Sequence, residues 1–442
     1  MKHFFLAALL LGGAICAQAG IADKVVRVRE GGIDVIAYRT AIKDVVTIVG
    51  SFPAGDAFAA TDAAAIPTLT GMMLDRGTLR QDKFAIAQRL ESVGATISFN
   101  VDTQTVDVRA RCLAKDLPLV IELIAEQLRQ PSFKKEEFEK VRQQFIGAVR
   151  GSIDNSSYRA RDAFNRALFP SGHPNRPLSI DQLLQSARTA TLAQVKAFHE
   201  THYGPANLLL VLVGDVREPV VRQAVKRAFG GWAGGLAPLI SPATARPAAP
   251  TQTQTVVLEG KPSVSVLLGQ TTGLRYRDPD TLALRVGTAV LGTGFTGRLM
   301  STVRDKEGLT YGIGAGISDD TFNDGTFGIS ATFAPQLLDL GLASTRRELR
   351  KWWSDGIRAE ELAERKQSLV GTYQVGLSTT GGLAAALLST AQRGLDLTWL
   401  DRYPDAIRAL TLEQVNAAIR KYLDPDKMVL VEVGTLPGNP KP

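Results

Sequence analysis

The sequence predicts an α+β protein built from two homologous, layered lobes. Three observations support this class. A segment near residue 200 recurs near residue 420, the expected strands and helices come in groups instead of strict alternation, and 442 residues exceed what one ordinary core accommodates. A hydrophobic content of 45% and a charged content of 21% are typical of a soluble globular protein.

The N-terminus has the parts of a secretory signal peptide. Lys2 supplies positive charge, residues 4–15 form an apolar run, and Ala17-Gln18-Ala19 has the small-x-small pattern of a cleavage site. The run is too short to cross a bilayer as a mature helix, and no later stretch reaches the length required. We therefore expect residues 1–19 to be removed on export to the periplasm, and we expect no transmembrane segment.

Cysteine content and charge say little about partners. Cys112 is the one cysteine expected to remain after cleavage, so no disulfide within the chain is predicted. The formal net charge of +7 is modest for this length. Solubility accounts for it, although a basic surface could also favour acidic peptides or a membrane face.

An internal repeat sets the architecture. Residues 191–214 and 411–434 align without a gap, each pair lying 220 residues apart. The identical pairs include Thr191/Thr411, Gln194/Gln414, Val195/Val415, Pro205/Pro425 and Gly214/Gly434. In each copy a threonine caps a helix, a proline-containing turn ends it, and a strand stops at glycine. We expect lobes at 20–240 and 256–442, joined by a linker at 241–255 rich in Pro, Ala and Thr.

Periodicity predicts the elements of each lobe in order. The first lobe is expected to contain strands Val25–Arg29, Ile33–Tyr38 and Val45–Ser51, helices Ala63–Asp75 and Phe84–Val93, a hairpin of Thr96–Asn100 with Val106–Arg111, and long amphipathic helices Leu117–Arg129 and Lys135–Asp154. The second is expected to repeat this order with strands Thr255–Leu258 and Ser263–Gly269, helix Asp278–Leu291 and a strand pair around Tyr311–Ala331.

Several motifs together resemble the pitrilysin/insulinase family of inverted zinc metallopeptidases, and the likeness covers nearly all of the mature chain. They are Arg76-Gly77-Thr78, the L-E-S-V-G-A-T-I-S-F run at Leu90–Phe99, Gln130-Pro131-Ser132-Phe133, the Y-G-P-A-N segment that begins at Tyr203, and G-R-L-M-S-T-V-R-D-K-E-G-L-T-Y-G at Gly297–Gly312. The resemblance implies a clamshell-type metallopeptidase fold.

The resemblance breaks at the metal site. Active members carry H-x-x-E-H on a first-lobe helix and a distal Glu on a later helix, so that two imidazoles and a carboxylate bind zinc while the Glu of the motif activates water. The His, Glu and His positions fall on Thr68, Gly71 and Met72, and the distal Glu falls on Gly147 or Ala148, with Ala148 the better match. None of these residues is an ordinary zinc ligand or general base, so we expect no metal in this chain.

The remaining histidines offer no substitute. His199 and His202 in H-E-T-H are three residues apart, not four, and their partners in the second copy of the repeat are Ile419 and Tyr422. We expect one to face the core and the other the surface. His173, in a segment rich in Pro and Gly, is expected to be a loop residue.

The second lobe keeps a different part of the family's site. Arg304 and Tyr311 match the family's Arg/Tyr pair, which binds substrate from the wall opposite the zinc. Gly308 should end the helix that carries Arg304 and let Tyr311 begin a strand, so that the two side chains converge. A guanidinium and a phenol both donate hydrogen bonds, and a scissile carbonyl accepts them. The alternative is a surface Arg in a salt bridge and a Tyr packed at a strand end.

Two further motifs are interpreted as structural. Residues 292–297 read G-x-G-x-x-G, with Asp319 and Asp320 about 20 residues on, but a dinucleotide site requires a strand before the glycines and Asp278–Leu291 has helical spacing. Asn323-Asp324-Gly325 is expected to be a hairpin turn, because no calcium-loop spacing with a closing Glu follows.

Three functions remain open from the sequence. The first is a non-catalytic, substrate-binding subunit of a periplasmic zinc metallopeptidase, in which a homologous H-x-x-E-H partner supplies zinc and Arg304 and Tyr311 contact the peptide. The second is a structural or peptide-binding protein with no role in proteolysis. The third is a self-sufficient hydrolase with a different site, for which zinc content is the discriminating measurement.

Overall fold

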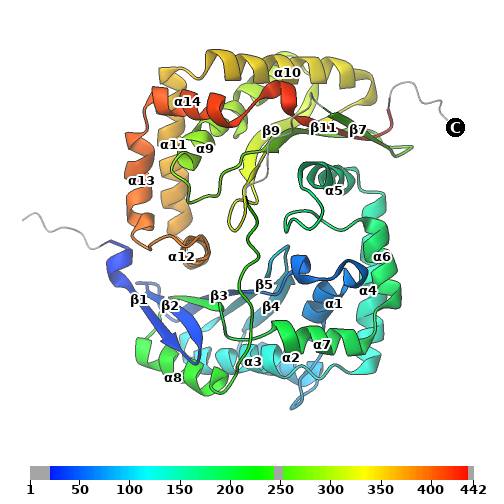
Figure 1. Cartoon of the computed structure of the whole chain (residues 1–442). Coiled ribbons are helices and arrows are strands. Elements are labelled where there is room, and N and C mark those ends of the chain that lie inside the picture. The colour runs from blue at the N-terminus through cyan, green and yellow to red at the C-terminus, as the bar shows by residue number, and fades with distance from the viewer. Residues whose placement is uncertain (1–19, 243–251, 437–442) are drawn as a thin grey trace, which may run out of the picture.

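A computed structural model describes residues 20–242 and 252–436, which form two sheets with helices on both faces (Figure 1). The predicted signal peptide, residues 1–19, lies outside the described residues, as does most of the predicted linker. Strands and helices are grouped as the sequence predicted, so the α+β class is confirmed.

The first sheet has six strands in the order β1-β2-β6-β3-β5-β4. Its strands are β1 (Val25–Glu30), β2 (Ile33–Arg39), β3 (Val45–Pro53), β4 (Thr96–Val101), β5 (Thr105–Leu113) and β6 (Leu209–Gly214). Strands β2 and β6 pair in parallel, and the other neighbours pair antiparallel. The predicted first-lobe strands and hairpin are therefore all present.

The second sheet repeats this topology with five strands in the order β7-β11-β8-β10-β9. Its strands are β7 (Gln252–Val257), β8 (Val264–Thr271), β9 (Thr310–Ser318), β10 (Thr326–Phe333) and β11 (Val429–Gly434). Strands β7 and β11 pair in parallel, as β2 and β6 do. Because β7 begins at Gln252, the last residues of the predicted linker are part of this sheet.

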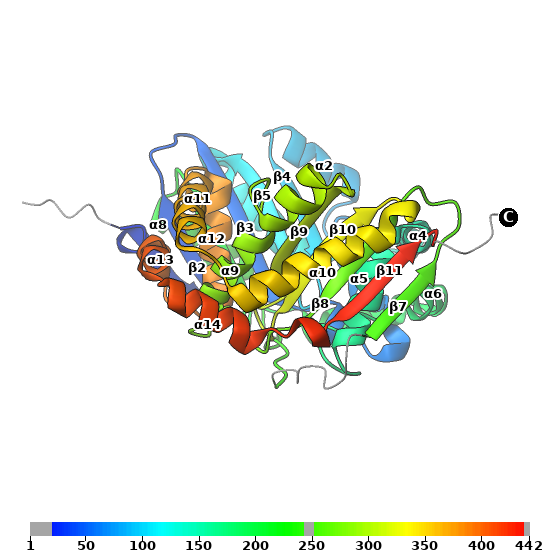
Figure 2. The same cartoon turned by 90° about the horizontal axis from the view of Figure 1, so that it is seen from above.

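Helices surround both sheets (Figures 1 and 2). They are α1 (Ile66–Met73), α2 (Lys83–Glu91), α3 (Leu117–Arg129), α4 (Lys135–Ile153), α5 (Ser156–Leu168), α6 (Ile180–Thr189), α7 (Leu192–His202), α8 (Glu218–Phe229), α9 (Thr281–Gly292), the π-helix η5 (Met300–Lys306), α10 (Leu338–Asp355), α11 (Ala359–Leu377), α12 (Thr380–Gln392), α13 (Trp399–Ala409) and α14 (Leu412–Tyr422).

The repeated helices α7 and α14 begin in the same way. The Thr191 hydroxyl accepts a hydrogen bond from the Gln194 N–H at 3.3 Å, and the Gln194 amide oxygen accepts one from the Thr191 N–H at 2.9 Å. Thr411 and Gln414 form the same capping box at 3.1 and 2.8 Å. The predicted threonine caps are confirmed, and each satisfies backbone donors that a helix start leaves free.

Each half lends one helix to the sheet of the other half. Helix α5 packs on the second sheet, where the buried cluster is Ala160, Phe164, Leu168, Phe169, Val429, Val431 and Val433. Helix α12 packs on the first sheet, where the buried cluster includes Leu383, Ala384, Leu387, Ile36, Val211 and Val213. Figure 1 shows both helices between the two sheets. The boundary predicted at the linker therefore separates the strands of the two sheets, but α5 and α12 each pack on the sheet of the opposite half.

The outer faces of the sheets carry the two large cores. Helices α3 and α8 pack on the first sheet through Val120, Ile124, Val221 and Val225. Helices α9, α10 and α14 cover the second sheet, and Trp352 at their centre is fully buried. The alternation of side chains along each strand explains why both faces can be covered by apolar contacts.

The segment Asn323-Asp324-Gly325 lies in the connection of the antiparallel β9–β10 hairpin, as predicted, but this connection is longer than a tight turn. The loop spans residues 319–325, and the Asn323 side chain is fully buried. Its amide oxygen accepts a hydrogen bond from the Ser241 N–H at 2.7 Å, and its amide nitrogen donates to the Leu239 carbonyl at 3.1 Å. The loop therefore fixes the end of the first half instead of making a tight turn.

Candidate functional site

Helix α1 carries Thr68, Gly71 and Met72, the positions to which the sequence analysis assigned the lost zinc motif, and these residues have other contacts. The Thr68 hydroxyl donates a hydrogen bond to the Asp56 carboxylate at 2.7 Å. Met72 is partly buried against the first core. Ala148 lies exposed on α4. A hydroxyl already bound to a carboxylate, a thioether in a core and a methyl group do not fit a zinc ion that prefers imidazole and carboxylate.

The general-base position is closed by its neighbours. A β-carbon on Gly71 would lie 2.2 Å from Cγ2 of Val101 on β4 and 3.9 Å from the Tyr203 hydroxyl. No glutamate could extend from this position without displacing Val101. Across residues 20–242 and 252–436, no group of three or more His, Cys, Asp or Glu side chains is placed to hold a metal ion.

The carboxyl group of Asp56 beside this position is perturbed. Burial raises the pKa of Asp56 to about 6, the hydrogen bond from Thr68 opposes the change, and the charge of Asp102 adds to it. Burial disfavours the charged form of a carboxyl group, so helix α1 packs beside an acid whose pKa is raised well above its ordinary value. Sequence reasoning missed Asp56, since nothing in its local pattern marks it.

The second half presents a different surface, formed by Arg304 and two aromatic rings. The Arg304 guanidinium carbon lies 5.2 Å from the Tyr311 ring centroid and 5.3 Å from the Phe295 ring centroid. Both rings are open to solvent, with Tyr311 87% and Phe295 71% exposed. Cation–π attraction holds an arginine between two aromatic faces, and the one ion pair of Arg304 within the described residues is a long contact of 3.9 Å between its Nε and Asp305.

The backbone brings Arg304 and Tyr311 together as the sequence predicted. Arg304 lies in the π-helix η5, and Gly308 ends it with φ at 64°. The Gly308 N–H donates to the Arg304 carbonyl at 2.9 Å, which closes the helix and lets Tyr311 enter β9. Left-handed φ is readily reached by glycine. The convergence is therefore present, while a role in substrate binding stays a prediction.

The glycine-rich segment 292–297 has a packing role. It follows helix α9, as expected, and not the strand that a dinucleotide site requires. A β-carbon on Gly292 would lie 2.1 Å from the Ala315 nitrogen, so only glycine permits this approach of α9 to β9. The same segment places Phe295 beside Arg304. The sequence analysis did not identify Phe295, because a single aromatic residue among glycines carries no distinctive signal.

A partly buried ion pair lies just before η5 in the chain. Arg298 donates to the Glu361 carboxylate at 2.6 and 2.8 Å and to the Gly356 carbonyl at 3.0 Å. Burial opposes ionisation of Glu361, but hydrogen bonds from Arg298 and from the Arg358 backbone outweigh it and lower the pKa of Glu361 to about 2. This bidentate pair ties the segment carrying Phe295 and Arg304 to helix α11.

The three histidines within residues 20–242 are all at least partly buried. His199 is buried and bonded to the Leu128 carbonyl at 2.7 Å. Of the two histidines expected to divide between core and surface, His202 is the more exposed, but it is half-buried and stacks on Phe198 with ring centroids 3.9 Å apart. His173 is a loop residue as predicted, and it is also buried, with Nε2 3.6 Å from an Asp324 oxygen of the second half. None of the three lies in a metal-binding group among the described residues.

Comparison with known proteins agrees with this arrangement. Residues 35–179 match insulinase (peptidase family M16), and residues 189–369 match the peptidase M16 inactive domain. An uncharacterized zinc protease of Streptomyces coelicolor is 25% identical over 361 residues, covering 79% of this chain and 76% of the relative. The non-peptidase homolog YmxG of Helicobacter pylori is 23% identical over 434 residues, covering 95% of this chain and 96% of the relative.

Solved structures share the fold over the same extent. A peptidase M16 inactive domain from Pseudomonas fluorescens superimposes with a TM-score of 0.85 at 26% identity, covering 93% of this chain and 98% of that one. The periplasmic protease PqqL of Escherichia coli gives 0.76 at 17% identity, covering 94% of this chain and 46% of that one. The chain therefore belongs to the insulinase family of M16 peptidases, as a non-catalytic member that lacks the family's zinc-binding residues.

Proposed function

We propose that this chain is the non-catalytic, substrate-binding subunit of a heteromeric zinc metallopeptidase in the periplasm. One asymmetry carries the proposal. Thr68, Gly71 and Met72 stand at the positions assigned to the zinc motif, with Val101 filling the space at Gly71, whereas Arg304 is partly exposed and lies against the exposed Tyr311 ring. Loss of function across the whole chain gives no reason for keeping one half of a site and closing the other.

Arg304 and Tyr311 are suited to hold a peptide while another subunit cuts it. The guanidinium and the phenol each donate hydrogen bonds to a carbonyl oxygen, and such donors stabilise the charge that develops there. The rings of Tyr311 and Phe295 limit the positions of the Arg304 side chain, which reduces the entropy lost on binding. A homologous subunit carrying H-x-x-E-H would supply the zinc.

A periplasmic location rests on the signal-like sequence of residues 1–19 and on the fold shared with a periplasmic protease. In the described parts of the chain no helix has the length and apolar character needed to cross a bilayer. A cleaved leader would release the mature chain where a partner exported in the same way could join it.

The test is reconstitution with an H-x-x-E-H homologue from the same organism. We expect the two chains to co-elute and to cleave a fluorogenic peptide library, and we expect Arg304→Ala or Tyr311→Phe to lower kcat/KM about tenfold or more. Arg350→Ala is the matched control, because Arg350 is an exposed arginine of α10 paired with Asp426. Cleavage that does not change when this chain is added, or when Arg304 is removed, would refute the proposal.

A structural or peptide-binding role outside proteolysis is the second candidate, and a relative described as a non-peptidase homolog favours it. Recovery of the chain from its native host in a stable complex that contains no peptidase would support this role. Zinc analysis of the purified chain addresses self-sufficient hydrolysis, because a tightly bound stoichiometric zinc would contradict both proposals.

A further inference from the structure

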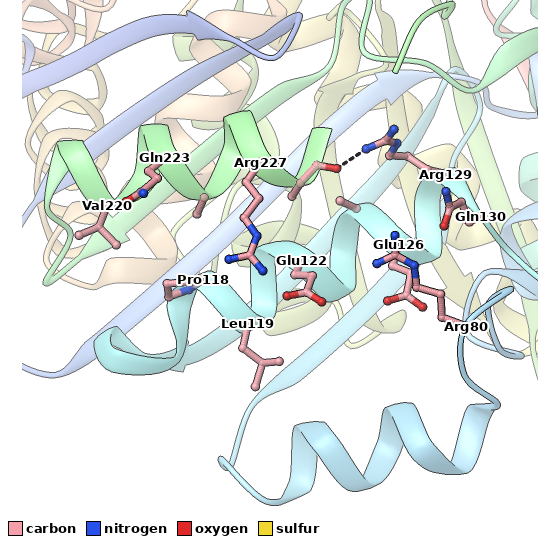
Figure 3. Close-up of a pocket in the computed structure, with 13 residues that line it drawn as sticks. Arg80, Pro118, Leu119, Glu122, Glu126, Arg129, Gln130, Val220, Gln223 and Arg227 are labelled. Carbon is pink, nitrogen blue, oxygen red and sulfur yellow. Dashed lines mark hydrogen bonds between the residues drawn. The ribbon is translucent and has the colours of Figure 1, made fainter. Parts of the chain in front are cut away.

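A groove between helices α3 and α8 lies on the outer face of the first sheet, away from α12 and from the second half (Figures 1 and 3). Its volume is about 520 Å³, which is within the range of small-molecule sites. The groove has two unlike ends. Its apolar end is formed by Pro118, Leu119 and Val220 and its basic end by Arg80 and Arg129, while Arg227 extends into the middle of the groove beside Glu122 (Figure 3).

The three arginines come from three elements and have no carboxylate partner. Arg80 lies in the loop before α2, Arg129 ends α3, and Arg227 extends from α8 toward α3 (Figure 3). Among the ion pairs of the described residues, none involves any of the three. Unpaired arginines from separate elements that converge on one cavity leave a local excess of positive charge.

The two glutamates that line the groove are engaged elsewhere. Glu126 is buried and accepts hydrogen bonds from the Thr78 hydroxyl and from the Gln81 amide at 3.1 Å. Glu122 lies 3.8 Å from Arg89 on α2. Neither glutamate forms an ion pair with Arg80, Arg129 or Arg227 within the described residues, and three arginines against two glutamates leave the lining with an excess of positive charge.

Arg129 is fixed in place close to another positive charge. It donates to the carbonyl groups of Ala228 and, at 3.3 Å, Gly230, which caps the end of α8. Burial and the charge of Arg80 both lower the pKa of Arg129. Capping of α8 explains the position of Arg129. It does not explain why Arg80 and Arg227 line the same groove. An anion between them would relieve this repulsion.

We propose that the α3–α8 groove binds a ligand that carries a carboxylate or phosphate group on an apolar body. The anionic group lies between Arg80 and Arg227, whose planar donor forks match carboxylate and phosphate oxygens. The apolar body lies along Leu119 and Val220 toward the other end. This site is separate from Arg304 and Tyr311 and does not depend on the proposed role in proteolysis.

The first experiment is calorimetric titration of the full mature chain with hexyl phosphate and hexanoate, with hexanol and inorganic phosphate as probes that lack one feature. We expect saturable binding of the two amphiphilic anions, weaker binding of phosphate and no binding of hexanol. The variant Arg80→Ala/Arg227→Ala should weaken binding about tenfold or more, because two charge-assisted contacts are lost. The control is Arg188→Ala/Arg402→Ala, which removes equal charge from exposed sites elsewhere.

Vesicles distinguish the source of the anion. Flotation with phosphatidylglycerol vesicles, compared with phosphatidylcholine vesicles, tests a lipid headgroup. Retention that requires Arg80 and Arg227 supports the groove with a lipid as its ligand, and titration without retention supports a soluble anion. The proposal is overturned when neither anionic amphiphile binds, or when the double variant and its control lose affinity equally.

Discussion

A β-carbon on Gly71 would lie 2.2 Å from Cγ2 of Val101, the residue that ends strand β4. The position of the family's general base is therefore closed by a second element of the fold. The closure is a property of how α1 packs on β4 and not of one substituted side chain. The contact between Gly71 and Val101 can be tested directly by substitution.

Gly71→Ala should destabilise the protein, because the added methyl group overlaps a stiff β-branched side chain. We expect a loss of about 1–3 kcal/mol of the free energy of unfolding. Gly147→Ala is the matched control on α4, where nothing lies within 4 Å of the new carbon. Helix propensity predicts that this control gains up to about 1 kcal/mol. Denaturant unfolding of both variants measures the difference, and equal effects would contradict the packing argument.

Restoring the motif alone should not restore zinc binding. The variant Thr68→His/Gly71→Glu/Met72→His places the glutamate against Val101 and still lacks the distal ligand near Ala148. We expect less than one zinc per chain by elemental analysis, together with a lowered Tm. Adding Val101→Gly and Ala148→Glu should raise the zinc content. Full occupancy in the triple variant would show that the space at Gly71 opens easily.

Much of the fold could be predicted because local signals and tertiary structure agree. Thr191 and Thr411 cap their helices as expected, and Gly308 ends η5 so that Arg304 and Tyr311 meet. Each of these features depends on a few neighbouring residues, for which sequence patterns carry the information.

The exchange of helices could not be predicted in the same way. The apolar positions of α5 show that one face is buried, but not which sheet covers it, and Phe164 proves to lie on the second sheet. Asn323 was assigned to a turn from its type, whereas its partners Leu239 and Ser241 are more than 80 residues away in sequence. Likewise, Phe295 becomes a candidate site residue only because its ring lies close to the Arg304 guanidinium.

Phe164→Ala should weaken the second sheet although Phe164 belongs to the first half of the chain. The side chain is 3% exposed and packs with Val429, Val431 and Val433. We expect a loss of about 3–5 kcal/mol, with faster hydrogen exchange in β8 and β11 than in β3. Phe138→Ala, in the first core, is the control and should accelerate exchange in the first half instead. Identical exchange patterns for the two variants would argue against the exchanged packing.

The Arg298–Glu361 pair should give stability that acid removes. The pKa of Glu361 is lowered to about 2, so the ionised pair stabilises the fold above the ordinary glutamate pKa and loses this contribution as pH falls toward 2. After allowance for solvent screening we expect about 1–2 kcal/mol. Glu361→Gln should have a lower free energy of unfolding than the parent chain at pH 7. This difference should become smaller near pH 2. A difference between the two chains that does not change with pH would contradict this assignment.

Asp56 should have the opposite pH dependence. Its pKa is raised to about 6, so the folded protein favours the protonated acid, and ionisation costs stability as pH rises from about 4 through 6. Asp56→Asn keeps an acceptor for the Thr68 hydroxyl and removes the charge. We expect this variant to match the parent chain near pH 4 and to exceed its free energy of unfolding by about 1–2 kcal/mol at pH 8.

Denaturant unfolding at both pH values is the measurement, and Asp62→Asn, on an exposed side chain of the same loop, is the control. If Asp56→Asn is less stable than the parent chain at pH 8, the ionised carboxylate is stabilised in the fold and its burial beside α1 does not disfavour the charge.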